Sequence, residues 1–236
     1  MQFLPKSFHL LVAALLLTQC TPGGSLSKSQ RQKLGSVFLT SGTLEDKAVQ
    51  SPQAVTLESQ QTIGFLSGFA LGPVGGVIAY ASINSKQKGF KEKNQSSVTK
   101  IEAGMPRDIA ALVTGELKTR LKSDPFFSSR LTDQAGGAQL SVTVTQMTLL
   151  KVPDERGFSP SITAVATLSD ATGTKLLKRF VMADGYGFNK KASVTDALAP
   201  LANYAADPAL LRQHYLKVAT VAAAVLATEL GLAAAQ

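Results

Sequence analysis

Residues with reactive or ionisable side chains are few in this chain, and their spacing does not suit catalysis. The chain has two histidines and one cysteine in 236 residues. His214 lies in a predicted helix, and no carboxylate stands three or four residues from it. We therefore expect His214 to be a surface or helix-packing residue, and we expect no catalytic site and no metal site of the histidine and cysteine type.

Two pairs of adjacent acids and one glycine-rich loop are the other candidates for chemistry. The acids of Glu45-Asp46 and Asp154-Glu155 fall in loop-like sequence, and adjacent residues rarely converge on one reacting atom, so we interpret both pairs as solvated. Gly185-Tyr186-Gly187 lacks the lysine and the serine or threonine of a phosphate loop. We instead interpret the loop from Asp184 to Asn189 as a surface that contacts a partner.

Cys20 is the remaining reactive group, and its position is informative. It follows one cation, Lys6, and an apolar run of about eight to ten residues, which is typical of a signal peptide. A membrane-spanning helix needs roughly 20 apolar residues. Because Cys20 is the only cysteine, no disulfide can form within the chain. A lone thiol at this position is best explained by acylation.

The residues before Cys20 resemble the lipobox of bacterial lipoproteins. The motif is Leu17-Thr18-Gln19-Cys20, with Gln19 where the family has Gly, Ala or Ser. The resemblance implies a signal peptide over residues 1–19, lipid on Cys20 and a lipidated tether over residues 20–34. No Asp follows Cys20, which in this family implies the periplasmic face of the outer membrane. The covalent lipid is the only cofactor that we expect.

Cleavage before Cys20 removes 19 of the 236 residues and leaves 217. The loss of Lys6 lowers the formal charge from +8 to +7. Such a length suffices for one domain with a real core. The surplus positive charge lies largely in two clusters, one beside the tether and one further along. These clusters either bind anionic lipid head groups or form a merely solvated face. Nucleic acid is not an expected partner, because aromatic residues are not interleaved with the cations. The clusters are Lys28, Arg31 and Lys33, and Lys86, Lys88, Lys91 and Lys93.

A long uncharged segment with regularly spaced glycines is the strongest functional signal. No charged residue occurs from Ser59 through Ser85, a run of 27 residues. Within it four glycines recur at a step of four, which brings them to nearly one face of a helix, where a second helix can approach closely. This glycine zipper predicts membrane lipid as a partner and a homo-oligomer. Its members are Gly64, Gly68, Gly72 and Gly76.

Pro73 leaves two shapes open for this segment. Either residues 62–83 form one kinked membrane helix of about 22 residues, or the cluster from Gly72 to Gly76 is the turn of a membrane-inserted hairpin. We slightly favour the hairpin. A third interpretation is a buried Gly-rich segment of a soluble domain.

The remaining sequence predicts an α/β (α+β) domain. Residues 35–58 form a first strand region, with a strand near 36–40, and residues 59–99 contain the apolar insertion and a basic linker. Residues 100–236 then form the periplasmic domain, in which two main helices cover one face of a small, mostly antiparallel sheet of three to four strands.

Local patterns place the elements of that domain. The apolar stripe after Pro106 predicts a helix that ends at Asp124-Pro125. Alternation from Leu140 shifts parity near Gln146, which predicts a β-bulge, and the segment 170–173 is a hairpin turn. The last helix begins with Asp207 as its N-cap, ends at Gly231 and packs on the sheet, because its uncharged stretch is too short to cross a membrane.

This element order resembles a loose group of envelope lipoproteins with an anticodon-binding-like α/β domain. The segments that carry the resemblance are Lys122-Ser123-Asp124-Pro125-Phe126-Phe127 and Gln139-Leu140-Ser141-Val142-Thr143-Val144. The group includes the curli-secretion lipoprotein, the surface-exclusion lipoprotein of conjugative plasmids and the lipoprotein activators of cell-wall synthases. The surface-exclusion type implies a glycine-rich insertion and ring formation.

Three functions follow from these observations. The leading hypothesis is a non-enzymatic, lipid-anchored envelope protein that self-associates through its zipper in the membrane, as a ring or pore component. The second is a monomeric periplasmic adaptor whose envelope protein partner is a transporter or a cell-wall synthesis enzyme. The third, a hydrolase, lacks an identifiable catalytic group.

Overall fold

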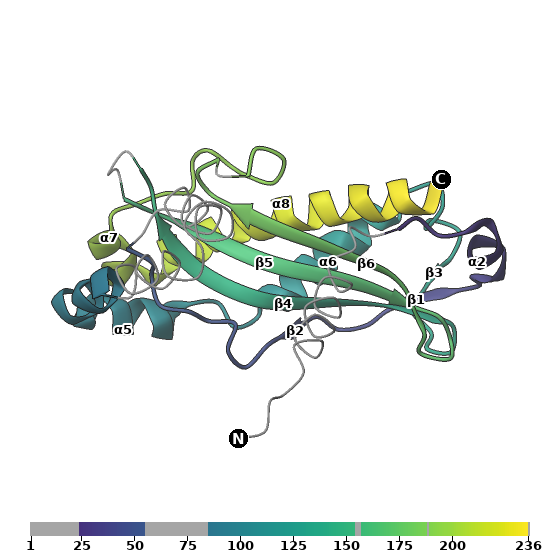
Figure 1. The fold of residues 1–236 in the computed structure, drawn as a ribbon, viewed down its shortest axis with the longest axis horizontal. Coiled ribbons are helices and arrows are strands. Elements are labelled where there is room, and N and C mark those ends of the chain that lie inside the picture. The colour runs from purple at the N-terminus through teal and green to yellow at the C-terminus, as the bar shows by residue number, and fades with distance from the viewer. Residues whose placement is uncertain (1–23, 55–84, 154–156, 188, 236) are drawn as a thin grey trace, which may run out of the picture.

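The computed structural model describes residues 24–54, 85–153, 157–187 and 189–235. They form two layers, with a mixed six-stranded sheet in one layer and the two longest helices packed on one sheet face in the other (Figure 1). The strand order is β3-β1-β4-β5-β6, and β2 also pairs with β4. The predicted α/β class with a mostly antiparallel sheet is confirmed.

Three long antiparallel strands form the centre of the sheet. They are β4 (Ala138–Lys151), β5 (Phe158–Ser169) and β6 (Lys175–Asp184). The pairing of β4 with β5 shifts register between Val144 and Gln146, which confirms the predicted bulge. Because side chains alternate between faces, the extra residue keeps Met147 on the buried face after Val144.

The turn between β5 and β6 has the predicted chemistry. One carboxylate oxygen of Asp170 accepts the backbone N–H groups of Thr172 and Thr174, both at 2.9 Å. Gly173 adopts a φ of +87°, a left-handed conformation that side chains rarely allow. The turn therefore sets the register of the hairpin.

Parallel strands extend the sheet beyond the three to four strands that the sequence predicts. β1 (Val37–Leu39), expected near residues 36–40, pairs in parallel with β4 and with β3 (Leu131–Thr132). β2 (Thr43–Leu44) also pairs in parallel with β4. A two-residue strand has too few residues to show alternation, so β2 and β3 could not be recognised from the pattern.

The two main helices, α6 (Ile109–Leu121) and α8 (Pro208–Ala235), pack on one face of the sheet. As predicted, Asp207 caps α8: its carboxylate accepts the N–H groups of Ala209 and Leu210 at 2.9 and 3.0 Å. The prediction that Gly231 ends this helix is wrong. The helix continues to Ala235, and Gly231 lies inside it at the point where the helix passes close to Asp124.

Among the described residues, α8 is the one helix that is long and apolar enough to cross a membrane. Its sheet-facing residues Leu211, Val218 and Leu226 have no exposed surface and belong to the core. The prediction that this helix packs on the sheet is therefore confirmed. The same core contains Ile109 and Leu117 of α6.

Shorter helices lie near the two ends of α8, whose 28 residues extend about 42 Å. The helix α2 (Lys28–Lys33) lies near its C-terminal end, where the N–H of Leu26 donates to the carbonyl of Ala233 at 2.9 Å. The helical stretch 85–93, α5 (Gln95–Gly104) and α7 (Leu201–Ala206) lie near its N-terminal end (Figure 1).

Candidate functional site

The residues that the sequence singles out for function lie outside the described residues. They are the lipidation residue Cys20 and the zipper glycines Gly64, Gly68, Gly72 and Gly76. The structure describes the chain that flanks them, at residue 24 on one side of the tether and at residues 54 and 85 on either side of the insertion. The candidate site is therefore the pair of junctions through which these segments join the folded body.

The first junction fixes the chain close to Cys20. The guanidinium of Arg179 donates to the carbonyl of Gly24 at 3.0 Å, and Leu26 is only 1% exposed. Ser27 and Gln30 then cap α2 reciprocally. Leu26 and Leu34 are buried, so this part of the predicted tether 20–34 belongs to the folded body. Cys20 is four residues from Gly24, or about 14 Å of fully extended chain.

The second junction joins the two ends of the insertion through one side chain. The amide of Gln87 donates to the carbonyl of Pro52 at 2.7 Å, and its oxygen accepts the N–H of Ala54 at 2.8 Å. Gln53 is held against β4, because its N–H donates to the carbonyl of Leu149 at 2.7 Å. The described chain therefore stops at residue 54 and resumes at residue 85 beside the same point.

Basic side chains surround this second junction. Lys86, Lys88, Lys91 and Lys93 are all exposed on the helical stretch 85–93. Lys88 and Glu92 form an exposed ion pair at 4.0 Å, which solvent screens strongly. The ring of Phe90 contacts that of Phe158, with centroids 5.7 Å apart, and so holds the stretch against β5. The lysines are therefore presented to solvent from a fixed position.

A polar cavity of about 510 Å³ lies beside these lysines, and its charges are balanced. Its lining includes Lys91 and Arg107 together with Asp46 and Glu102. The Ser51 hydroxyl donates to the Glu102 carboxylate, and Arg107 donates to the Glu102 carbonyl at 3.4 Å. Since opposite charges offset one another, this lining does not select a strongly charged ligand.

His214 lies in a buried contact between helices, which confirms the helix-packing interpretation. Its Nδ1 is 2.8 Å from the hydroxyl of Tyr204, and His214 is 7% exposed. Burial lowers the pKa of His214, so the neutral ring is favoured and can accept the hydrogen bond. Nearby, the Tyr215 hydroxyl donates to the carbonyl of Thr148 at 2.9 Å. These groups tie α7 and α8 to the body.

The acidic residues have structural partners or face solvent. Asp184 is fully buried and accepts the N–H groups of Tyr186, Gly187 and Asn189, so it organises the loop that we interpret as a partner contact. Glu45 and Asp46 are exposed, as predicted, and Asp154-Glu155 lies outside the described residues. No group of three or more His, Cys, Asp or Glu that could hold a metal occurs among the residues described.

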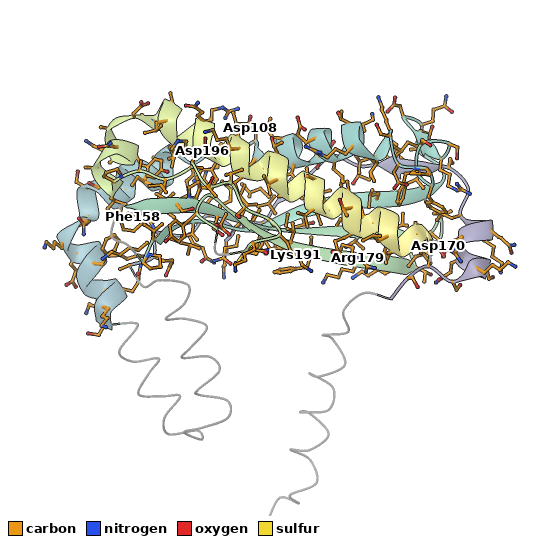
Figure 2. All side chains as sticks on the ribbon, turned by 90° about the horizontal axis from the view of Figure 1, so that it is seen from above. Asp108, Phe158, Asp170, Arg179, Lys191 and Asp196 are labelled. Atoms are coloured by element: carbon orange, nitrogen blue, oxygen red, sulfur yellow. The ribbon has the colours of Figure 1, made fainter. Side chains whose placement is uncertain are left out.

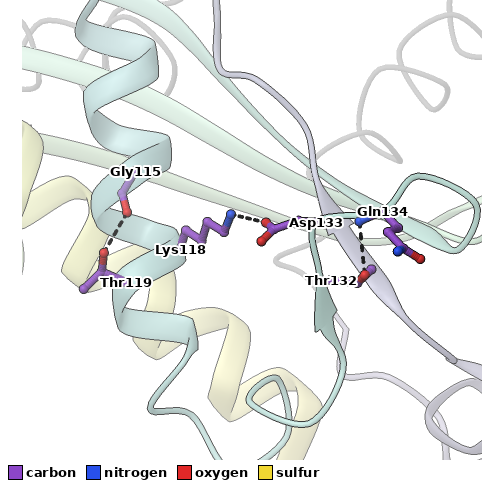
Figure 3. A network of polar contacts seen from close by, with 6 residues as sticks. All are labelled: Gly115, Lys118, Thr119, Thr132, Asp133 and Gln134. Atoms are coloured by element: carbon purple, nitrogen blue, oxygen red, sulfur yellow. Dashed lines mark hydrogen bonds and ion pairs between the residues drawn. The ribbon is translucent and has the colours of Figure 1, made fainter.

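Polar contacts on the outer surface of α6 connect it to the strand β3 and the turn after it (Figure 3). The ammonium of Lys118 contacts the carboxylate of Asp133 and lowers its pKa, chiefly by hydrogen bonding. Thr119 donates to the carbonyl of Gly115 at 3.1 Å, and the N–H of Gln134 donates to the hydroxyl of Thr132 at 3.1 Å. Solvent surrounds Asp133, so this network positions the turn and does not form a reactive site.

No protein-family model, no curated protein and no solved structure matches this chain. The two residues that define the junctions, Arg179 and Gln87, were not recognised from the sequence. Their partners lie 155 and 33 to 35 residues away. Nothing in the sequence around either residue marks it for such a contact.

Proposed function

We propose that this chain is a non-enzymatic, lipid-anchored cell-envelope protein on the periplasmic face of the outer membrane. Lipid on Cys20 anchors one end. The apolar segment between residues 54 and 85 enters the membrane as a hairpin and associates with copies of itself, as a component of a ring or pore.

The contact of Gln87 with both Pro52 and Ala54 is the observation that carries this proposal. A single membrane helix of about 22 residues is about 33 Å long, so its two ends lie on opposite sides of the bilayer. A segment whose ends share one amide must return to the side from which it left. Of the two shapes that the sequence allows, this favours the hairpin.

The self-association follows from the composition of the segment. Lipid removes the hydrophobic drive between helices and rewards close backbone approach, which glycines at a step of four permit. In water each interior glycine destabilises a helix by roughly 0.5–1 kcal/mol relative to alanine. In the proposed hairpin Gly72 and Gly76 belong to the turn, so Gly64 and Gly68 of its first arm are the glycines that we propose to meet a second helix in lipid.

The decisive experiment measures the size of the detergent-extracted mature lipoprotein. Gly64→Leu with Gly68→Leu is expected to convert an oligomer to a monomer, because leucine separates the helix faces by several ångströms. Ala70→Leu places the same leucine side chain two residues after Gly68, on the opposite side of the same predicted helix, and is expected to leave the oligomer intact.

A monomeric wild-type particle would contradict the self-association and favour the alternative, a periplasmic adaptor that serves a transporter or a cell-wall synthesis enzyme. An oligomer that survives the double substitution would contradict the zipper as its contact.

A further inference from the structure

Ser159, Ser161 and Thr163 of β5 are buried, so the sheet face opposite α6 and α8 is covered towards the N-terminal end of α8. Towards the C-terminal end of α8 that face is partly to fully exposed. Its side chains there alternate along the strands with the buried ones. We call this exposed part the open face, and we define it by Ser141 and Thr143 of β4, Val165 and Thr167 of β5, and Lys178 and Phe180 of β6. These six residues include one cation and no acid.

Phe180 is the most unusual residue of the open face. It is 64% exposed, and it pairs across the strands with Val165. Phe180 and Leu232 are the two exposed large hydrophobic side chains among the described residues. The neighbouring Lys178 is exposed on the same face. Helices that lie in the interface between lipid and water combine apolar side chains such as Phe with lysine or arginine.

The two junctions of the body lie towards opposite ends of the sheet. Gly24 is held by Arg179 near the C-terminal end of α8, and Ala54 is held by Gln87 near its N-terminal end. In Figure 2 the stretch before α2 and the helical stretch 85–93 both extend from the sheet on the side away from α6. Any membrane attachments through these junctions are therefore separated along the long axis of the body and lie on one side of it.

We propose that the open face rests on the membrane surface, with anionic lipid head groups as its ligand. The inference builds on the proposed function, because it needs both attachments. Two attachments on one side keep the long axis of the body parallel to the bilayer. Phe180 then reaches the interface, and Lys178 meets the head groups, while α6 faces the periplasm.

A single tryptophan tests this orientation, because the chain contains none. The mature lipidated full-length protein with Phe180→Trp is placed in vesicles of phosphatidylethanolamine and phosphatidylglycerol with brominated acyl chains. Its emission is expected to fall roughly twofold relative to unbrominated vesicles, because interfacial aromatic rings lie at head-group level beside the chains. Glu116→Trp, on the exposed side of α6, is the matched control and is expected to keep its emission.

The outcomes separate this inference from the function on which it rests. Protein that does not float with vesicles overturns both. Protein that floats but keeps the emission of Trp at position 180 overturns the orientation alone. A blue shift of the tryptophan emission without quenching by bromine also overturns the orientation, because protein and not lipid then covers the open face. Should Phe180→Trp fail to fold, Thr167→Trp probes the same face and retains Lys178.

Discussion

Two helical glycines, Gly115 and Gly231, have opposite surroundings. A Cβ added at Gly115 of α6 meets nothing within 4 Å, whereas one added at Gly231 of α8 collides with the carboxylate of Asp124. That carboxylate cannot turn away freely, because its other oxygen accepts the N–H groups of Phe126 and Phe127 at 2.9 and 3.0 Å. The same residue type is therefore incidental in one helix and required in the other.

We expect alanine to act in opposite directions at these positions. Gly115→Ala should raise the free energy of unfolding by about 0.5–1 kcal/mol, the usual gain from replacing glycine inside a helix. Gly231→Ala should lower it by about 1 kcal/mol, because the collision outweighs that gain. Urea unfolding of both variants measures the difference, and equal stabilisation would show that Asp124 yields without loss.

Elements distant in the sequence meet at the insertion junction. The extended chain before residue 54 lies along β4, and the helical stretch 85–93 packs on β5 through Phe90. The side chain of Gln87 is the polar link between them. Each hydrogen bond of this kind stabilises a protein by about 1 kcal/mol.

Removing this link should loosen one junction without unfolding the body. In Gln87→Ala we expect the Ala54 amide to exchange its hydrogen roughly fivefold faster, since about 1 kcal/mol corresponds to a factor of about five. The backbone amides of β4 should keep their protection against hydrogen exchange. Lys88→Ala, at an exposed neighbouring position, serves as the control. Unchanged exchange at Ala54 would mean that other contacts hold the two ends together.

The folded body is longest along α8, and its two ends hold different parts of the chain. The first described residues and the C-terminal end of α8 meet at one end, and the insertion is attached at the other. Global unfolding breaks both junctions and also exposes the buried His214. Its protonation therefore couples the stability of the entire body to pH.

The direction of this coupling follows from the lowered pKa of His214. Burial is the main cause, the cation of Lys217 adds to it, and Asp196 opposes it. The unfolded state takes up a proton near the ordinary pKa of 6.5, whereas the folded state resists protonation. Stability contributed by the neutral ring is thus present above pH 6.5 and is lost as the pH falls towards the folded-state pKa.

We expect the melting temperature to fall between pH 7 and pH 5, and to fall less in His214→Asn, whose amide can still bond the Tyr204 hydroxyl. Thermal unfolding at several pH values measures both. Tyr204→Phe keeps the titrating ring and is expected to retain the dependence. An identical slope in wild type and His214→Asn would assign the dependence to other groups.

Much of the fold was predictable because its signals are local. The alternation of β4, the bulge before Gln146 and the turn at Asp170 each arise from residues within a few positions of one another. The N-cap Asp207 is equally local. The short strands β2 and β3 could not be recognised, since parallel pairing with distant chain produces them. The end of α8 was misplaced because Gly231 serves a contact with Asp124, not a helix cap.

The candidate site likewise combines features that follow from local sequence with features that depend on distant residues. The sequence alone shows that one cysteine follows a short apolar run and that an uncharged segment with regularly spaced glycines interrupts the domain. The contacts of Gln87 with both ends of that segment, and of Arg179 with the chain near the cysteine, emerge only in the folded protein. Periodicity and capping act over a few residues, whereas these hydrogen bonds form only after the sheet has brought distant residues together.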